Sequence, residues 1–336
     1  MYNPICIQKY MIYDIFHNDT NRIIIISPNE TNCLNINYIE ENIKFKLKVC
    51  PHNHTYIYIS DNTVEYKEKI KLKINNEVIE TRVNKYPECK NMILMSTLVL
   101  NEDNYIKQWI NFHSNIGIDK FIIYDNAGID DKKSYHSIEK NSDLKNLLKD
   151  YIENKKVILI KWPYPKRLNK SGLSGQTTQQ NHSIYAFQNS KYIGLFDIDE
   201  YVNMQNEKNI KLFFEKTIKN YKINTKEIGG FHLYNKYFYN PSNLPTNNYN
   251  FLKIYNCSKI IYNKQEKIFI IPKNIETFSI HVITRGKKAY ILNEKEIYFN
   301  HYFFLNKKDR GKEKTNLIDK TIIKHTSNLF NSSSVS

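Results

Sequence analysis

The sequence predicts an α/β protein with a mostly parallel sheet that carries helices on both faces, preceded by a small all-β module. Three observations lead to this prediction. Residues 1–88 contain short strand-like runs without a helical period. From residue 91 onward, apolar strand-like runs alternate with helical segments, a pattern typical of parallel sheets connected by helices. Polar residues directly follow several of these runs, at the sheet edge where ligands bind in such folds.

The N-terminal region is rich in β-forming residues. Its candidate strands are residues 23–26, 45–49, 56–59, 70–74 and 78–83. The last two are joined by Asn75 and Asn76, a turn dipeptide that tolerates the positive φ angles of a tight hairpin. We therefore assign residues 1–88 to a small all-β module of unknown role, and we expect it to be separable from the rest of the chain.

The second region, residues 89–305, opens with an almost continuous apolar run at 92–100, as expected of a buried parallel strand. A helix begins at Asp103, places Ile106 and Trp109 on one face, and ends at Gly117. Continued alternation predicts strands at 121–124, 157–162, 192–196 and 229–234, and helices at 134–151, 176–188 and 210–219. A charged segment, residues 306–336, follows and ends in a serine-rich tail that we expect to be disordered.

Composition limits the partners of this chain. The net charge of +15 attracts phosphate-bearing molecules, but the lysines are scattered and form no long basic run. We interpret the charge as a solvated surface, with nucleic-acid binding as the less favoured alternative. No window of 18 apolar residues and no secretory signal is found. We therefore expect a soluble protein without a transmembrane anchor, located in the cytoplasm or peripheral to a membrane.

The sharpest local signal is the acidic motif Asp197-Ile198-Asp199, which follows the apolar run 192–196. Carboxylates two residues apart at the end of a strand project into one crevice, where they repel each other unless a cation neutralises them. Mn²⁺ or Mg²⁺ does this and can also bridge to a diphosphate. The motif therefore predicts a divalent-cation site for a phosphate-bearing ligand.

Two further strand ends carry polar side chains, at Glu102 and at Asp125. Each also has a simpler explanation. Glu102 lies at the start of a helix, where a carboxylate complements the helix dipole. Asp125 is suited to an Asx turn. We leave both interpretations open.

Several short pieces of the chain from Ser96 onward form one further pattern. These pieces are residues 101–109, residues 117–126, Gln176 with Asn181 and His182, residues 197–201, Ile280 with His281, His301 with Tyr302, and Arg310 with Gly311. In this order they resemble glycosyltransferase family 92 and its relatives among the family-2-like glycosyltransferases, and their number argues against chance.

The resemblance implies a GT-A-type, Rossmann-like fold and a metal-dependent transferase. It implies a UDP-linked hexose donor (galactose in many members), Mn²⁺, inversion at the anomeric carbon, and a glycan or glycoprotein acceptor. It also implies roles by position. Glu102 and Asp125 would contact the nucleoside, Gln176 the donor, Asp197 the ribose and metal, Asp199 and His281 the metal, and Arg310 the diphosphate. His301 is the alternative third metal ligand.

The chain also departs from the family pattern. Residues 250–255 contain no carboxylate where family members carry an acid, and Ala127 and Gly128 replace the usual serine. An inverting transfer needs a general base for the acceptor hydroxyl. Glu200, Glu276 and Asp309 are candidates, and we take Asp199 and Glu200 as the catalytic pair. The missing acid keeps a second possibility open, a catalytically inactive protein that binds nucleotide sugars.

Overall fold

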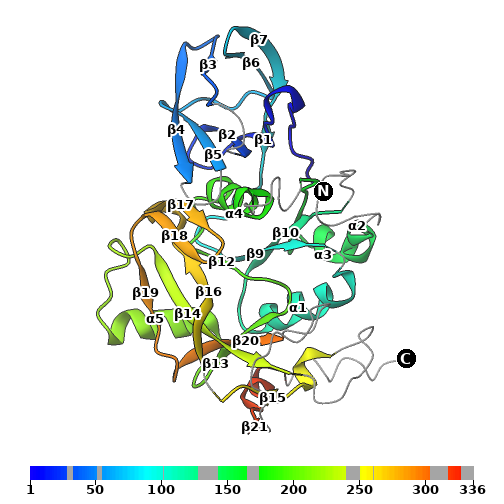
Figure 1. Cartoon of the computed structure of the whole chain (residues 1–336), viewed down its shortest axis with the longest axis vertical. Helices are drawn as coiled ribbons and strands as arrows, with labels where there is room; N and C mark the ends of the chain where they lie inside the picture. The colour runs from blue at the N-terminus through cyan, green and yellow to red at the C-terminus, as the bar shows by residue number, and fades with distance from the viewer. Residues whose placement is uncertain are drawn as a thin grey trace.

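The computed structural model describes residues 1–28, 33–50, 55–100, 102–127, 143–164, 174–239, 250–259, 261–302 and 317–326. An all-β module at the N-terminus lies against a larger mixed α/β domain, and helix α4 runs between the two (Figure 1). Within this described part of the chain, no helix is both long and apolar enough to cross a membrane.

The N-terminal module is a single antiparallel sheet that curls around its own core, apart from one short parallel pair. Its order is β7-β6-β3-β4-β5-β2-β1-β8. All five predicted runs are strands, and Asn75 has the positive φ expected of the hairpin turn (54°). The elements are a 3-10 turn η1 (Gln8–Tyr10), β1 (Asp14–His17), β2 (Ile23–Pro28), β3 (Ile36–Tyr38), β4 (Ile43–Cys50), β5 (Thr55–Ser60), β6 (Lys69–Ile74), β7 (Glu77–Arg82) and β8 (Asn84–Lys85).

The main sheet is parallel in the half that carries the predicted ligand edge. Its first four strands have the order β11-β10-β9-β12. Val99, Asp125 and Lys161 are level with one another, so three of these strands end at the same edge. The four strands are β9 (Ile93–Val99), β10 (Lys120–Asp125), β11 (Val157–Lys161) and β12 (Tyr192–Leu195). The predicted parallel sheet is confirmed for this half.

The other half of the sheet adds antiparallel strands to the predicted parallel ones: β14 pairs parallel with β19 and β20, whereas the remaining pairs there are antiparallel. β16 pairs antiparallel with both β12 and β14, and β13 pairs antiparallel with β20. The additional strands are β13 (Glu200–Met204), β14 (Gly230–Phe238), β15 (Asn256–Cys257), β16 (Tyr262–Ile270), β19 (Ala289–Ile291), β20 (Ile297–Tyr302) and β21 (Leu317–Ile318), with a separate hairpin of β17 (Ile275–Ser279) and β18 (Val282–Gly286). Direction of pairing depends on long-range contacts, so the periodicity of one strand does not reveal it.

Helices cover both faces of the sheet, as predicted. Trp109, Leu148 and Phe214 belong to one core on one face, whereas α4 packs into a second core on the other. Helix α1 ends at Asn115 with Ile116 as its C-cap, and the next residue, Gly117, has a φ of +103°, which suits glycine. The helices are α1 (Asp103–Asn115), α2 (Leu144–Leu147), α3 (Lys149–Glu153), α4 (Ser174–Ala186) and α5 (Ile210–Asn220), with 3-10 turns η3 (Phe251–Lys253), η4 (Pro272–Asn274) and η5 (Thr321–His325). The predicted helix 134–151 appears as α2 and α3, and residues 134–142 lie outside the described residues.

Helix α4 is buried between the sheet and the N-terminal module. Phe16 and Ile57 of the module share one hydrophobic core with Ile184 of α4 and Ile122 of the sheet. The module also contacts α4 through a hydrogen bond between the hydroxyl groups of Thr55, in β5, and Thr178 (3.0 Å). This shared core argues against the expectation that the module can be separated, because removing it would expose one whole side of α4 to water. The boundary at residue 88 itself stays a prediction.

Candidate functional site

The acidic motif lies in the short connection between β12 and β13. Strand β12 is apolar and fully buried, and the chain turns polar directly after it, so Asp197 and Asp199 emerge at its carboxyl end. In the antiparallel pair of β13 and β20, Glu200 lies opposite His301. The N–H of Tyr302 also donates to the carbonyl oxygen of Asp199 (2.9 Å). Strand pairing therefore brings a residue one hundred positions away to the acidic motif.

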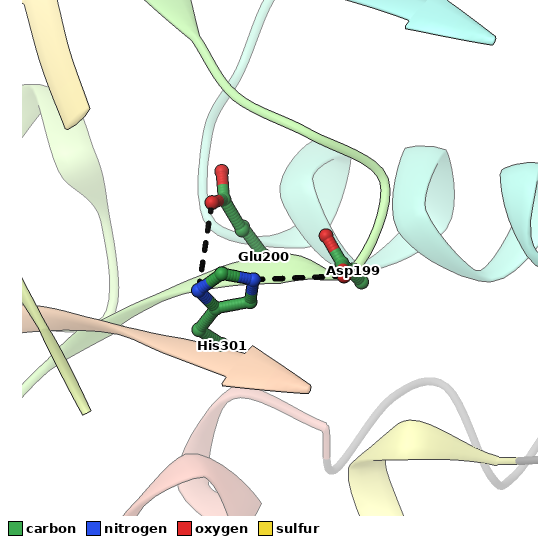
Figure 2. A group of neighbouring side chains, drawn as sticks. All are labelled: Asp199, Glu200 and His301. Carbon is green, nitrogen blue, oxygen red and sulfur yellow. Dashed lines mark ion pairs between the residues drawn. The ribbon is translucent and has the colours of Figure 1, made fainter. Parts of the chain in front are cut away.

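Three side chains converge at this point: His301 from β20, Glu200 from the start of β13, and Asp199 from the connection just before it (Figure 2). The Nε2 atom of His301 is 3.6 Å from Oδ2 of Asp199, and its Nδ1 atom is 3.9 Å from Oε1 of Glu200. One ligand atom from each residue lies within 4.8 Å of the others. Two carboxylates and an imidazole fit a divalent ion that accepts oxygen and nitrogen ligands. The group can therefore hold a metal.

A lysine that the sequence did not reveal also belongs to this site. The ammonium group of Lys267, on β16, is 2.7 Å from Oδ2 of Asp197 and 3.0 Å from Oε2 of Glu200. The same Oε2 atom accepts the backbone N–H of Asp197 (2.8 Å). The Lys267 and Glu200 side chains are almost fully buried, at 2% and 1% exposed. One oxygen of Glu200 thus binds Lys267, and the other faces His301.

Burial and charge together set the protonation of this group. Burial raises the pKa of Glu200 to about 7, although Lys267 opposes the rise. For His301, burial alone would lower the pKa, but the carboxylates of Asp199 and Glu200 raise it above its ordinary value. Burial would likewise lower the pKa of Lys267, and its two carboxylate partners raise it instead. Because only a neutral imidazole can ligate, metal binding by His301 releases a proton whenever the ring is protonated.

His281 lies in the turn between β17 and β18. Its Nδ1 atom donates to the carbonyl oxygen of Glu266 (3.0 Å), which leaves Nε2 with a free lone pair. Burial and the charge of Lys267 lower its pKa to about 4, so the ring is neutral at pH 7. Metal-binding histidines commonly have this arrangement. His281 is nevertheless absent from the converging group of three, so its ligand role stays a prediction.

The backbone before His281 is held in an uncommon conformation. Ile280 has a φ of +43°, which is costly for a β-branched residue. Gln180 of α4 binds both of its peptide groups: the Oε1 atom accepts the N–H of Ile280 (3.0 Å), and Nε2 donates to its carbonyl oxygen (3.4 Å). The neighbouring Asn181 binds the backbone of Phe278 in the same two-way manner. Helix α4 therefore fixes the turn that carries His281.

The other predicted site residues are placed as follows. Asp125 ends β10 and accepts the N–H of Ala127 (3.1 Å), so the Asx turn is present, which leaves a nucleoside contact untested. Glu102 precedes α1 and its side chain makes no capping hydrogen bond there. Gln176 is buried in the first turns of α4 instead of facing solvent. Glu276 pairs with Lys48 of the module (2.8 Å). Arg310 and Asp309 lie outside the described residues.

The fold and site together define the class of protein. A parallel α/β sheet with a potential metal-binding group at the carboxyl end of one strand suits an enzyme that acts on a phosphate-bearing ligand. The chain belongs to glycosyltransferase family 92, because the model of that family matches residues 90–333. This confirms the resemblance and makes the protein a glycosyltransferase, with a sugar donor and an acceptor. A search of curated proteins found no match to this chain.

Proposed function

We propose that this protein transfers a hexose, with galactose as the first candidate, from a UDP-linked donor to a glycan or glycoprotein acceptor with inversion. The observation that carries the proposal is the convergence of Asp199, Glu200 and His301 at the end of β12 in a chain of family 92. A transferase of nucleotide sugars must stabilise the negative charge that develops on the leaving diphosphate. A site built from metal ligands at a strand end meets that need.

In this proposal the ion is Mn²⁺, held by Asp199, His301 and Oε1 of Glu200, with His281 as a further ligand. When bound, Mn²⁺ supplies Lewis-acid stabilisation of the diphosphate leaving group. Side chains of the protein supply the other contacts to the donor. Asp197 is available to the ribose as well as to Lys267, because its side chain is 44% exposed. The remaining donor contacts in the proposal are Glu102 and Asp125 to the nucleoside, Gln176 to the donor, and Arg310 to the diphosphate.

The acceptor hydroxyl needs a base. The pKa of Glu200 suits that role, whereas its burial opposes it. Its pKa of about 7 suits proton transfer near neutral pH. Its side chain is 1% exposed, however, and Oε2 already accepts two hydrogen bonds. Burial therefore favours a role in holding Lys267 and His301 over direct contact with the acceptor. Glu200→Gln keeps the shape of the side chain but removes both its basicity and the charge that pairs with Lys267, so a loss of transfer supports the role of base only if the melting temperature and Mn²⁺ binding are unchanged.

The proposal is tested by release of UDP from a panel of UDP-hexoses, with glycan acceptors, in the presence of Mn²⁺ or EDTA. We expect release to require the metal and to fall about 100-fold or more in Asp199→Asn, with an unchanged melting temperature. Asp150→Asn, an exposed carboxylate on α3, is the matched control. Undiminished metal-dependent release by Asp199→Asn would contradict the proposed site.

A second candidate is a protein that binds nucleotide sugars without transferring them. The absence of an acid in residues 250–255 favours it, and the structure gives this stretch another task. Phe251 and Leu252 are buried in the core, and the Asn250 side chain accepts a hydrogen bond from Gln108 of α1 (2.7 Å). Binding of UDP-hexose with Mn²⁺, detected as a rise in melting temperature but without UDP release for any acceptor, would favour this candidate.

A further inference from the structure

Lys267 is a buried charge that none of the assigned roles uses. Only 2% of its side chain is exposed, and a lysine at such a position is tolerated only when its ammonium group is paired. Its ion-pair partners are Asp197 of the acidic motif, at 2.7 Å, and Glu200 directly after the motif, at 3.0 Å. The ammonium group of Lys267 therefore supplies a positive charge at the position where the sequence predicts that the carboxylates of the acidic motif need a bound cation.

The two sides of Glu200 separate this internal cation from the candidate metal position. Oε2 binds Lys267 and the N–H of Asp197, whereas Oε1 faces His301. Asp199 pairs with His301 on that second side. The carboxylates of the motif are thus divided between a lysine on one side and a histidine on the other.

We propose that Lys267 is the permanent counter-ion of the acidic motif, so that the crevice is folded and partly neutralised before any divalent ion binds beside Asp199 and His301. The inference rests on the proposed metal site and says what limits the affinity of that site for the ion. A nearby positive charge repels a divalent ion, so Lys267 weakens metal binding in the absence of donor. The diphosphate of a nucleotide sugar restores negative charge, so metal and donor bind together more strongly than either binds alone.

The test compares Mn²⁺ binding by the full-length protein with that of Lys267→Met, which removes the charge but keeps most of the side-chain volume. Free Mn²⁺ is followed by electron paramagnetic resonance without nucleotide. We expect the Kd of Lys267→Met for Mn²⁺ to fall about tenfold or more, and that of Lys267→Arg to stay near the natural value. An unchanged or higher Kd in Lys267→Met overturns the proposal, because the lysine would then only hold the ligands in place.

Stability gives a second readout that does not depend on catalysis. Without metal, Lys267→Met removes the cation that pairs with Oε2 of the buried Glu200, so the melting temperature of the variant should fall by several degrees and recover when Mn²⁺ is added. The charge-balanced variant Lys267→Met/Glu200→Gln should fold without metal at a melting temperature close to the natural one. If the double variant is as unstable as the single one, Lys267 acts through packing and the proposal fails.

These readouts also separate this inference from the proposed function. Natural protein that binds no Mn²⁺, with or without UDP, would contradict the metal dependence of transfer. The melting temperatures of Lys267→Met and of the charge-balanced variant then still decide whether Lys267 is the counter-ion. Recovery in the charge-balanced variant supports that role, and the absence of recovery overturns it.

Discussion

Two clusters of buried charged side chains differ in how their carboxylates are paired. The first surrounds Asp14, which joins the N-terminal module to α4 and is fully buried. Its carboxylate accepts five hydrogen bonds, at 2.6–2.9 Å. The donors are the N–H groups of Ile5 and Ile15, the Asn84 amide, the Tyr86 hydroxyl and Nε2 of His182. The other ring nitrogen of His182 accepts a hydrogen bond from the hydroxyl of Tyr124 (2.7 Å).

The second cluster surrounds the acidic motif and is open. Three carboxylates, those of Asp197, Asp199 and Glu200, share one lysine and one histidine, and the separations of 3.6 and 3.9 Å to His301 are too long for good hydrogen bonds. Asp197 is also partly exposed. A closed network of donors around a single carboxylate fixes a structure, whereas an excess of carboxylates with room between them leaves capacity for a ligand. The first cluster therefore has the features of a structural network, and the second fits the function proposed for it.

The largest expected effect comes from breaking the closed cluster. Asp14→Ala leaves a buried histidine, a tyrosine and two backbone N–H groups without their acceptor, so we expect the free energy of unfolding to fall by about 3–5 kcal/mol. Urea unfolding measures it, with Asp150→Ala as the exposed control. Mn²⁺ binding by the folded fraction should be unchanged. If Asp14→Ala changes the free energy of Mn²⁺ binding more than the free energy of unfolding, the first cluster is not the purely structural one.

A smaller effect is expected at His113, which is buried and satisfied like Asp14 but lies beside the second cluster. Its Nδ1–H donates to the carbonyl oxygen of Trp109 (2.9 Å), and Nε2 accepts the N–H of Val202 in β13 (3.3 Å). Burial lowers its pKa to about 3. The unfolded chain binds a proton below about pH 6.5 and the folded chain does not, so this contribution to stability is present above pH 6.5 and is lost as the pH falls toward 3.

Urea unfolding at pH 7 and pH 5 measures the contribution of His113. We expect the natural protein to lose about 2 kcal/mol more between these values than His113→Gln, whose side chain does not titrate. Equal pH dependence of the two proteins would show that His113 titrates normally in the folded state, against its buried position.

The smallest expected effect distinguishes the two histidines near the acidic motif. His301 lies beside Asp199 and Glu200, so we expect His301→Ala to weaken Mn²⁺ binding about tenfold or more, and His281→Ala to weaken it less. His17→Ala, in the N-terminal module, controls for the loss of a buried imidazole. Mn²⁺ resonance titration gives the Kd values. A larger loss in His281→Ala than in His301→Ala would return the ligand role to the residue that the family resemblance indicates.

The sequence by itself determined five strands of the N-terminal module, the alternation of strand and helix that builds the parallel half of the sheet, the family and the position of the acidic motif. These features are local: β-branched runs, helical spacing and a polar turn after an apolar strand are each read within a few residues. The start of α1 at Asp103 also followed from the sequence, and the helix ends two residues before the predicted Gly117. Asn181 and His182 were recognised as part of a motif in the same way, without a reason for their presence.

Tertiary structure decided which of these residues meet. In the sequence, Lys267 stands at the start of an apolar run and is interpreted as a solvated charge. The pairing of β16 with β12 and β14 brings it to Asp197. His301 reaches Glu200 through the register of β13 with β20. His182 has a role only because the N-terminal module supplies Asp14. Sheet register and domain packing depend on contacts between residues far apart in the chain, and a pattern within one segment carries no information about them.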